Sequence, residues 1–248
     1  NMSKTLLPAL LPGIWLFLSG IPSISRAESI KLLVQEFPPF TFTDLKTEEI
    51  TGVLTDKVQE IMRRAHEAPS IRSTSLVRAM QATRNDDNTC MFGFRHTQER
   101  APQFLWIGPL IAEDWVLFGR KSDTHNFKTP EEAKPYSIGS YKNSATGLEM
   151  AGLGYNMQFA REDQDNPRLL FNNRIDFWIA PEIHGMLIAQ QQGYANDIKR
   201  IVKYKSIDMH MLCNLHMDKH RIELFNKLNR DIDSDGTMTK ILHKYGIR

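Results

Sequence analysis

Residues 30–65, IKLLVQEFPPFTFTDLKTEEITGVLTDKVQEIMRRA, contain the first strand and the first helix that the sequence predicts. The run Ile30–Val34 is short and apolar and is followed by Pro38-Pro39, a pattern typical of a buried strand that ends in a loop. Apolar residues at positions 54, 58, 61, 62 and 65 then recur at the spacing of one helix face. The stretch therefore predicts a strand followed by a covering helix, which is the repeating unit of an α/β fold.

The same alternation continues along the chain and predicts further strands and helices with short connections. Strands are expected from position 71 and at 90–94, 115–118, 136–140, 175–180 and 209–215, and helices at 76–83, 144–153, 183–192 and, as a pair, within 221–245. This order implies parallel sheets covered by helices on both faces. We expect two doubly wound lobes, residues 28–118 with 204–248 and residues 119–203, joined by a two-strand hinge with crossovers near 115–121 and 202–210. Ligands of such sheets bind beyond the carboxyl ends of the strands, here in the cleft between the lobes.

The amino terminus has the pattern of a secretory signal peptide, which we assign to residues 1–27. Lys4 precedes an apolar stretch at 6–18, and Ser25-Arg26-Ala27 puts small residues at the −3 and −1 positions of a cleavage site. A membrane anchor is the alternative. It requires about 20 uninterrupted apolar residues, and Pro8 and Pro12 interrupt this stretch. Cleavage after Ala27 predicts an exported protein that is not inserted in the membrane.

Composition and charge exclude several classes of protein. The chain has 248 residues, of which 41% are hydrophobic and 24% charged, which is typical of a globular protein and excludes collagen-like, disordered and coiled-coil chains. The formal net charge is +2 and there is no run of five like charges, so no nucleic-acid partner is expected. The two cysteines, Cys90 and Cys213, can pair after export or remain as two buried thiols, and the sequence leaves both readings open.

No metal or other cofactor is predicted. Asp231-x-Asp233-x-Asp235 resembles the start of a calcium loop, but its twelfth position is Leu242, where a bidentate Glu is required. A polar turn between two helices explains these residues. The segment Cys213-x-x-His216-x-x-x-His220 has metal-like spacing but offers only three candidate ligands across a predicted strand.

Six short motifs follow one another along most of the chain. They are Phe37-Pro38-Pro39-Phe40, Gly52 with Asp56, Thr97-Gln98-Glu99-Arg100, Phe104–Pro109, Asn173–Trp178, and Asp235-Gly236-Thr237 with Ile241 and Tyr245. Together and in this order they resemble the bacterial extracellular solute-binding proteins of family 3, the periplasmic binding proteins of polar amino acid uptake systems. The resemblance implies the type II periplasmic binding fold, periplasmic localisation, a monomer, a small carboxylate ligand captured by hinge closure, and the permease of an ABC transporter as partner.

The resemblance also implies which residues bind the ligand. Arg100 matches the arginine that clamps the ligand carboxylate, and Thr97 matches the donor beside it; a surface salt bridge with Glu99 is the alternative for Arg100. Phe37 matches the aromatic plate over the ligand, or is an ordinary core residue. Ser144, at the start of a predicted helix, matches a hydroxyl of the second lobe that closes on the same carboxylate, although Ser is also a common helix cap.

Departures from the family pattern bear on the choice of ligand. Pro181 stands where amino-acid binders commonly have the Asp that pairs with the ligand ammonium, and Glu182 is next to it. Arg95 stands where a Thr or Ser often faces the ligand, and because an unpaired buried guanidinium is costly, an anionic group or Glu182 should lie against it. Trp178 belongs either to the cleft or to the buried sheet. We therefore expect a carboxylate ligand whose amino group is absent or differently placed, with room for a second acid.

Two further functions use the same scaffold. A periplasmic enzyme, such as a small-acid dehydratase or lyase, needs a general acid or base in the cleft, for which Glu182, Glu36 and His96 are the candidates. These residues show no triad or metal-ligand spacing, so no catalytic residue is predicted and a non-enzyme is expected. A ligand-sensing domain is the third reading.

Overall fold

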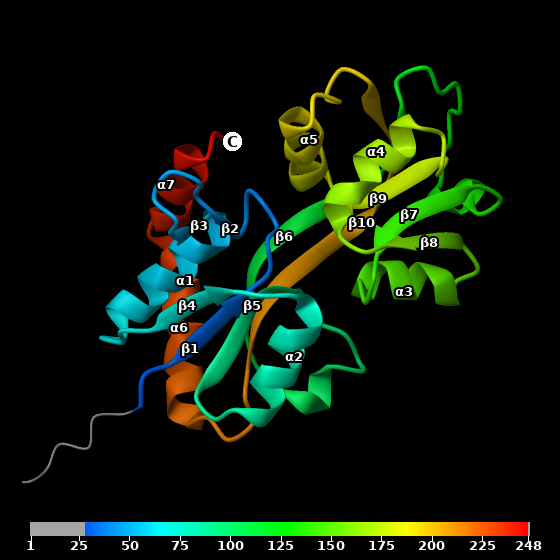
Figure 1. Ribbon diagram of the computed structural model, residues 1–248. Helices are drawn as coiled ribbons and strands as arrows, with labels where there is room; N and C mark the ends of the chain where they lie inside the picture. Colours follow the sequence, from blue (N-terminus) through cyan, green and yellow to red (C-terminus); the bar gives the residue numbers. More distant parts are fainter. Residues whose placement is uncertain (1–27, 248) are drawn as a thin grey trace, which may run out of the picture.

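The computed structural model describes residues 28–247 (Figure 1). The predicted signal peptide, residues 1–27, lies outside the described residues. Within them, no helix combines the length and the apolar character needed to cross a membrane. The predicted fold class is confirmed: the protein consists of two α/β lobes joined by two long strands.

The first lobe combines the amino-terminal part of the chain with its carboxyl-terminal end. Its strands run parallel in the order β4-β1-β5. Side chains alternate across this sheet, so Leu32 and Val34 pack in the core that includes α1 and α6, whereas Leu33 packs with α2 on the opposite face. The elements are β1 (Lys31–Val34), β2 (Phe42–Thr43), β3 (Ile50–Thr51), α1 (Val53–Arg64), β4 (Ser70–Ser73), α2 (Leu76–Asn85), β5 (Thr89–Arg95), a 3₁₀ turn η1 (Ala101–Gln103), α6 (Lys219–Ser234) and α7 (Thr237–Lys244).

The second lobe is built from the middle of the chain. Its parallel strands lie in the order β9-β7-β8, and apolar side chains fill the cores on both faces: Phe177 and Ile179 on one, Trp178 and Ala180 on the other. The elements are η2 (Pro130–Ala133), β7 (Ser137–Tyr141), α3 (Ala145–Gly152), β8 (Asn156–Ala160), η3 (Asp163–Asp165), α4 (Asn166–Phe171), β9 (Phe177–Pro181) and α5 (Glu182–Gln191).

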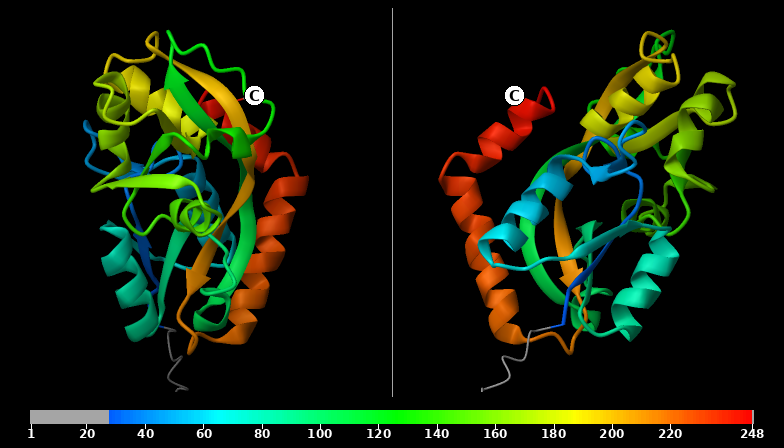
Figure 2. Two further views of the ribbon diagram at one scale, coloured as in Figure 1. Left: turned by 90° about the vertical axis from the view of Figure 1, so that its right-hand side faces the viewer. Right: turned by 60° about the vertical axis from the view of Figure 1, so that its left-hand side comes forward.

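Two antiparallel strands, β6 (Leu105–Arg120) and β10 (Ile198–Cys213), connect the lobes. Figure 2 shows both strands curving from one lobe into the other. Residues 209–213 of β10 pair with β5 in the first lobe, and residues 115–118 of β6 pair with β9 in the second. One hydrogen-bonded sheet of eight strands therefore runs through the molecule in the order β4-β1-β5-β10-β6-β9-β7-β8. The crossovers expected near 115–121 and 202–210 overlap these two strands.

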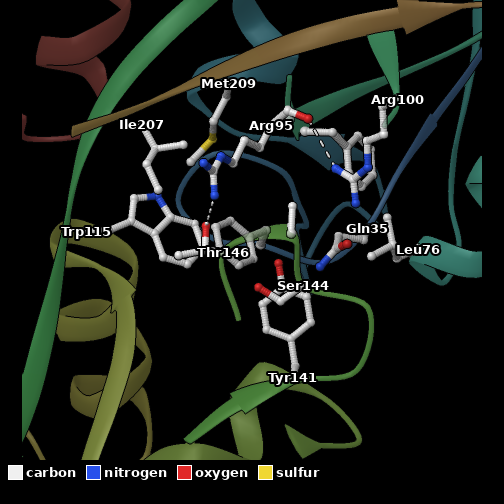
Figure 3. A pocket seen from close by; sticks show the side chains of 14 residues that line it. Gln35, Leu76, Arg95, Arg100, Trp115, Tyr141, Ser144, Thr146, Ile207 and Met209 are labelled. Atoms are coloured by element: carbon white, nitrogen blue, oxygen red, sulfur yellow. Dashed lines mark hydrogen bonds between the residues drawn. The ribbon is translucent and has the colours of Figure 1, made fainter. Parts of the chain in front are cut away.

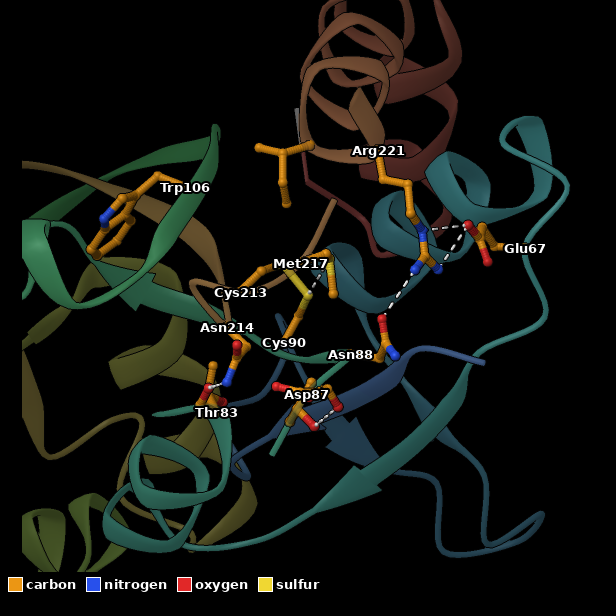
Figure 4. Close-up of a disulfide and its surroundings, with 12 residues drawn as sticks. Glu67, Thr83, Asp87, Asn88, Cys90, Trp106, Cys213, Asn214, Met217 and Arg221 are labelled. Atoms are coloured by element: carbon orange, nitrogen blue, oxygen red, sulfur yellow. Dashed lines mark hydrogen bonds and ion pairs between the residues drawn. A yellow bond between two sulfur atoms is a disulfide. The ribbon is translucent and has the colours of Figure 1, made fainter. Parts of the chain in front are cut away.

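Cys90 of β5 and Cys213 of β10, which the sequence left open, form a disulfide (Figure 4). The two residues are register partners on neighbouring strands, with their Cα atoms 4.0 Å apart, and both are fully buried. They are 123 residues apart in the sequence. The bond therefore fixes the end of β10 to the sheet of the first lobe.

The loop before α1 requires glycine at position 52. Gly52 has φ +126°, and a Cβ atom there would lie 2.3 Å from the carbonyl oxygen of Phe40. Its N–H donates to the hydroxyl of Tyr245 at 3.0 Å, and the same hydroxyl donates to Asp56 at 3.0 Å. Lys244 also donates to Asp56, at 2.6 Å. The Gly-x-x-x-Asp motif and the carboxyl-terminal Tyr thus form one contact, which holds α7 against α1.

Candidate functional site

A cavity lies where the two lobes meet the long strands (Figure 3). The carboxyl ends of β1, β5 and β7 and the first turn of α3 surround it, which is the position where α/β sheets bind ligands. Four of the predicted site residues line it: Phe37, Arg95, Arg100 and Ser144. The structure adds further lining residues, among them Gln35, Leu76, Trp115, Tyr141, Thr146, Ile207 and Met209.

Arg100 is partly buried, and its guanidinium points toward Gln35 in the cavity (Figure 3). Its Nη1 donates to the backbone carbonyl of Arg95 at 3.1 Å. Burial lowers the pKa of Arg100, although the nearby Tyr141 and Glu99 act in the opposite direction. Burial partly desolvates this cation, and the carbonyl oxygen that it contacts bears no formal charge and does not neutralise it. A partly desolvated cation of this kind favours the binding of an anion.

Arg95 pairs with Glu149 of α3 in the second lobe, and its Nη1 donates to Thr146 at 3.4 Å. The sequence predicted that an anionic group or Glu182 lies against Arg95. The partner is an anionic side chain, Glu149, and the suggestion of Glu182 is wrong. Glu182 begins α5 and accepts instead from Arg200 on β10 at 2.8 Å. Helix α3 presents its carboxylate to the end of β5, so the partner comes from the same helix that lines the cavity.

Glu149 has two donors besides Arg95. Lys205 Nζ lies 2.6 Å from Oε1, and the hydroxyl of Tyr204 donates to the same oxygen. Burial alone would raise the pKa of Glu149, but hydrogen bonds from Lys205, Tyr204 and Arg95 lower it. Glu149 is therefore an ionised carboxylate at the junction of both lobes and the hinge strand β10.

Hydroxyl groups from the second lobe face Arg100 across the cavity. Ser144 is buried and caps α3 by accepting from the N–H of Gly147 at 3.2 Å, so it serves as the helix cap as well as lining the cavity. Tyr141 ends β7 beside Ser144 (Figure 3). Burial raises the pKa of Tyr141, which keeps its hydroxyl protonated and able to donate a hydrogen bond to an anion.

Phe37 lines the cavity and packs face to face on His184, with 3.7 Å between ring centroids. His184 belongs to α5 of the second lobe and is fully buried. Its Nδ1 lies 2.6 Å from the carbonyl oxygen of Pro38, and its Nε2 lies 2.8 Å from Asp163. Since a carbonyl oxygen only accepts, Nδ1 carries the proton of that bond. The predicted aromatic residue is thus held by a contact between the lobes.

Three predicted ligand-binding residues do not line the cavity. Thr97 forms the turn before Arg100 and accepts from its backbone N–H at 3.2 Å. Trp178 is fully buried and donates to Asp163 at 3.0 Å; strand alternation directs it into the core under α5. Glu182 is turned toward Arg200, as described above. The structure therefore brings together four of the seven residues.

The residues considered for other chemistry have structural partners. Glu36 accepts from Thr43 and Ser73, and His96 packs against Trp106 with ring centroids 4.3 Å apart. Of the calcium-like acidic residues, Asp233 pairs with the buried Lys57 at 2.6 Å, and Asp235 pairs with Arg64. Across residues 28–247, no three His, Cys, Asp or Glu side chains are grouped so as to hold a metal ion.

Some lining residues had a signal in the sequence and others had none. Gln35 follows the first predicted strand and Tyr141 follows another, so both lie at strand ends where ligands bind. Thr146 lies in the first turn of the helix that Ser144 caps. Trp115 gave no signal as a lining residue, and neither did Glu149 as the partner of Arg95, because both roles depend on how the two lobes meet.

Comparison with protein-family models gives one match, to bacterial extracellular solute-binding proteins of family 3, over residues 30–247. A search of curated protein sequences found no match. Solved structures similar to this chain include a histidine kinase sensor domain with similarity to periplasmic binding proteins, at 15% identity and a TM-score of 0.79, covering 88% of this chain and 95% of that one.

Two other similar structures are binding proteins. An ancestral arginine-binding protein bound to arginine has 18% identity and a TM-score of 0.74, with 87% of this chain and 97% of that one covered. A periplasmic binding protein of an arginine 3rd transport system from Legionella pneumophila has 20% identity and a TM-score of 0.73, with 88% and 99% covered. At these identities the likeness shows the fold.

Proposed function

We propose that this chain, which belongs to the bacterial extracellular solute-binding proteins of family 3, captures a small carboxylate-bearing ligand in the cavity between its lobes. The observation that carries the proposal is Arg100, a partly desolvated cation that points into the cavity. Its fork of donors matches the two oxygens of a carboxylate. Tyr141 and Ser144 approach from the second lobe and add hydroxyl donors.

Capture by lobe closure follows from where these groups come from. Arg100 and Phe37 belong to the first lobe and Ser144 and Tyr141 to the second, and within residues 28–247 the chain passes between the lobes along β6 and β10. A ligand that contacts both lobes favours the closed arrangement because it binds that arrangement more tightly. We assign residues 28–118 with 204–248 to the first lobe and residues 119–203 to the second.

We further propose that the ligand leaves unchanged, that the protein is an exported periplasmic monomer, and that it delivers its ligand to the permease of an ABC transporter. One similar structure is the substrate-binding protein of an amino acid ABC transporter, which supports the last point. The acid and base candidates Glu36 and His96 line hollows that adjoin the cavity. Glu36 is held by Thr43 and Ser73. His96 packs on Trp106, and these contacts support binding without turnover.

Titration calorimetry with a panel of small carboxylic acids and amino acids tests the binding proposal. An Arg100→Ala substitution should weaken binding of the best acid about 100-fold, since it removes a desolvated, charge-assisted pair of hydrogen bonds. The exposed Arg168→Ala is the matched control and should leave affinity unchanged. Equal affinities for the wild-type protein and Arg100→Ala would refute the proposal, and chromatography of the ligand after long incubation tests turnover.

A ligand-sensing role is the second candidate, and the similarity to a histidine kinase sensor domain favours it. Uptake of the radiolabelled ligand in cells with and without this chain separates the two. Loss of uptake supports transport. Unchanged uptake together with a lost transcriptional response to the ligand supports sensing.

A further inference from the structure

The indole N–H of Trp115 has no hydrogen-bond partner within the described part of the chain, although its nitrogen is buried. Trp115 is 5% exposed and lines the cavity from β6, in the middle of the molecule. Buried N–H donors are nearly always paired in folded proteins. A donor that remains unpaired beside a ligand cavity is an available contact for an acceptor atom of the ligand.

Two other donors lie at the same end of the cavity. Figure 3 shows Arg95 and Thr146 beside Trp115, away from Arg100. Arg95 Nη1 donates to Thr146, and both line the cavity with Trp115. A guanidinium, a hydroxyl and an indole N–H form a set that fits a second carboxylate, because together they offer several donors to one anion.

The pairing of Arg95 with Glu149 does not block this use. Glu149 keeps the donors Lys205 and Tyr204, so its negative charge stays compensated when some N–H groups of the Arg95 guanidinium bind a ligand. Arg95 has five N–H groups, and those on Nη1 face Thr146 rather than Glu149. One guanidinium can therefore contact Glu149 and a ligand oxygen together.

The residues that line the cavity include two arginines and, within the described chain, no Asp or Glu. A ligand whose ammonium or guanidinium group lies in this cavity would have no carboxylate among the lining residues to neutralise it, at a large desolvation cost. The carboxylates of Glu36 and Glu162 belong to the adjoining hollow. A ligand with two acid groups would instead neutralise Arg100 and give Arg95, which already pairs with Glu149, a second anionic contact.

We propose that Arg95, Thr146 and Trp115 form a second anion subsite, and that the ligand is a small dicarboxylic acid without a basic group. One carboxylate binds at Arg100 and the other at this subsite. The inference rests on the proposed carboxylate capture and goes beyond it by assigning the second subsite and the chemical class of ligand.

Calorimetry with succinate and glutarate, compared with butyrate, L-glutamate and L-arginine, tests the ligand class. At least one of the two diacids should bind about 100-fold more tightly than butyrate, because it makes a second charge-assisted contact. L-Glutamate should bind at least about tenfold more weakly than glutarate. Equal affinity for butyrate and the diacids, for L-glutamate and glutarate, or tightest binding of L-arginine would overturn the proposal.

Substitutions test the subsite itself. Arg95→Gln should weaken diacid binding about 100-fold and should weaken butyrate binding by a factor at least about tenfold smaller, because butyrate loses only the interlobe pair of Arg95 with Glu149. Trp115→Phe, which keeps an aromatic ring but removes the indole N–H, should weaken diacid binding about tenfold. Arg200→Gln and Trp106→Phe are matched controls outside the cavity and should match the wild type. Thermal unfolding of each variant verifies folding.

The outcomes separate the two proposals. If Arg100→Ala abolishes acid binding while folded Arg95→Gln and Trp115→Phe bind diacids like the wild type, the second subsite is refuted and carboxylate capture stands. If no acid binds the wild-type protein, both fail.

Discussion

Glu113, in the segment of β6 that joins the lobes, is predicted to make stability fall as the pH rises. Glu113 is 8% exposed, and its register partner on the neighbouring strand β10 is Ile207. Burial, together with the negative charges of Asp114 and Glu182, raises the pKa of Glu113 to about 7 from the ordinary 4.5. The folded protein therefore holds a proton at pH values where the unfolded chain has lost it.

The difference in the pKa of Glu113 between the folded and the unfolded chain sets the sign and the size of the pH dependence of stability. The contribution of Glu113 to the free energy of unfolding is complete below about pH 4.5, decreases as the pH rises toward and through about 7, and then stays constant. Full ionisation costs about 3 kcal/mol more in the folded protein than in the unfolded chain. At about pH 5 roughly 1 kcal/mol of this cost is present, and at about pH 8 nearly all of it is.

Glu113→Gln removes the titration and keeps the shape of the side chain. Relative to the wild type, the variant should gain about 2 kcal/mol in free energy of unfolding between about pH 5 and pH 8. Urea denaturation followed by tryptophan fluorescence at the two pH values measures this change. Glu223→Gln, which removes an exposed carboxylate, is the control and should show no such dependence. A pH-independent difference between Glu113→Gln and the wild type would refute the reasoning.

Two further predictions concern the disulfide and the contact between the lobes. Replacing Cys90 and Cys213 together by Ser should lower the free energy of unfolding by about 2–5 kcal/mol, because the bond closes a long loop; a wild-type protein whose urea midpoint does not respond to reductant would contradict this. His184→Ala removes the ring stacked on Phe37 and the hydrogen bond to Pro38, so ligand affinity measured by calorimetry should fall about tenfold. Unchanged affinity would exclude a role of this contact in closure.

The elements that the sequence predicted are those with a strong apolar pattern. The strands at 30–34 and 90–94 and the helix at 54–65 appear as β1, β5 and α1, because buried parallel strands and amphipathic helices have distinct periodicities. The first half of β10 was expected only in part, as the hinge crossover near 202–210, and its beginning at Ile198 was not predicted. Its sequence, IKRIVKYKSID, is rich in charge and mostly exposed or only partly buried, and it forms a strand because β6 supplies a long antiparallel partner. Such pairing depends on tertiary context, which local patterns do not contain.

The site was predictable where it depends on chain position relative to a strand end. Arg100 and Phe37 were assigned from the family resemblance, and because they follow β5 and β1 closely, the fold places both at the cavity. The orientations of Trp178 and Glu182 could not be predicted in this way. The direction of Trp178 depends on which face of β9 points to the cavity, and that of Glu182 depends on the axis of α5. A one-residue change of phase in a strand moves a side chain to the opposite face.

Arg95 shows how a physical argument can predict a requirement without identifying the residue that meets it. The cost of an unpaired buried guanidinium predicted an acidic partner, and the fold supplies Glu149. Because that partner comes from the other lobe, we expect Arg95 to contribute to the proposed lobe closure as well as to the proposed diacid subsite. A monoacid bound at Arg100 leaves the Arg95–Glu149 contact as the only anionic contact of that guanidinium, whereas a diacid adds a second anion to it from within the cavity. The selectivity we propose for diacids therefore depends on Arg95, which belongs to the first lobe and contacts both Glu149 of the second lobe and the ligand. This selectivity should weaken when Arg95 is replaced, even though Arg100 remains intact.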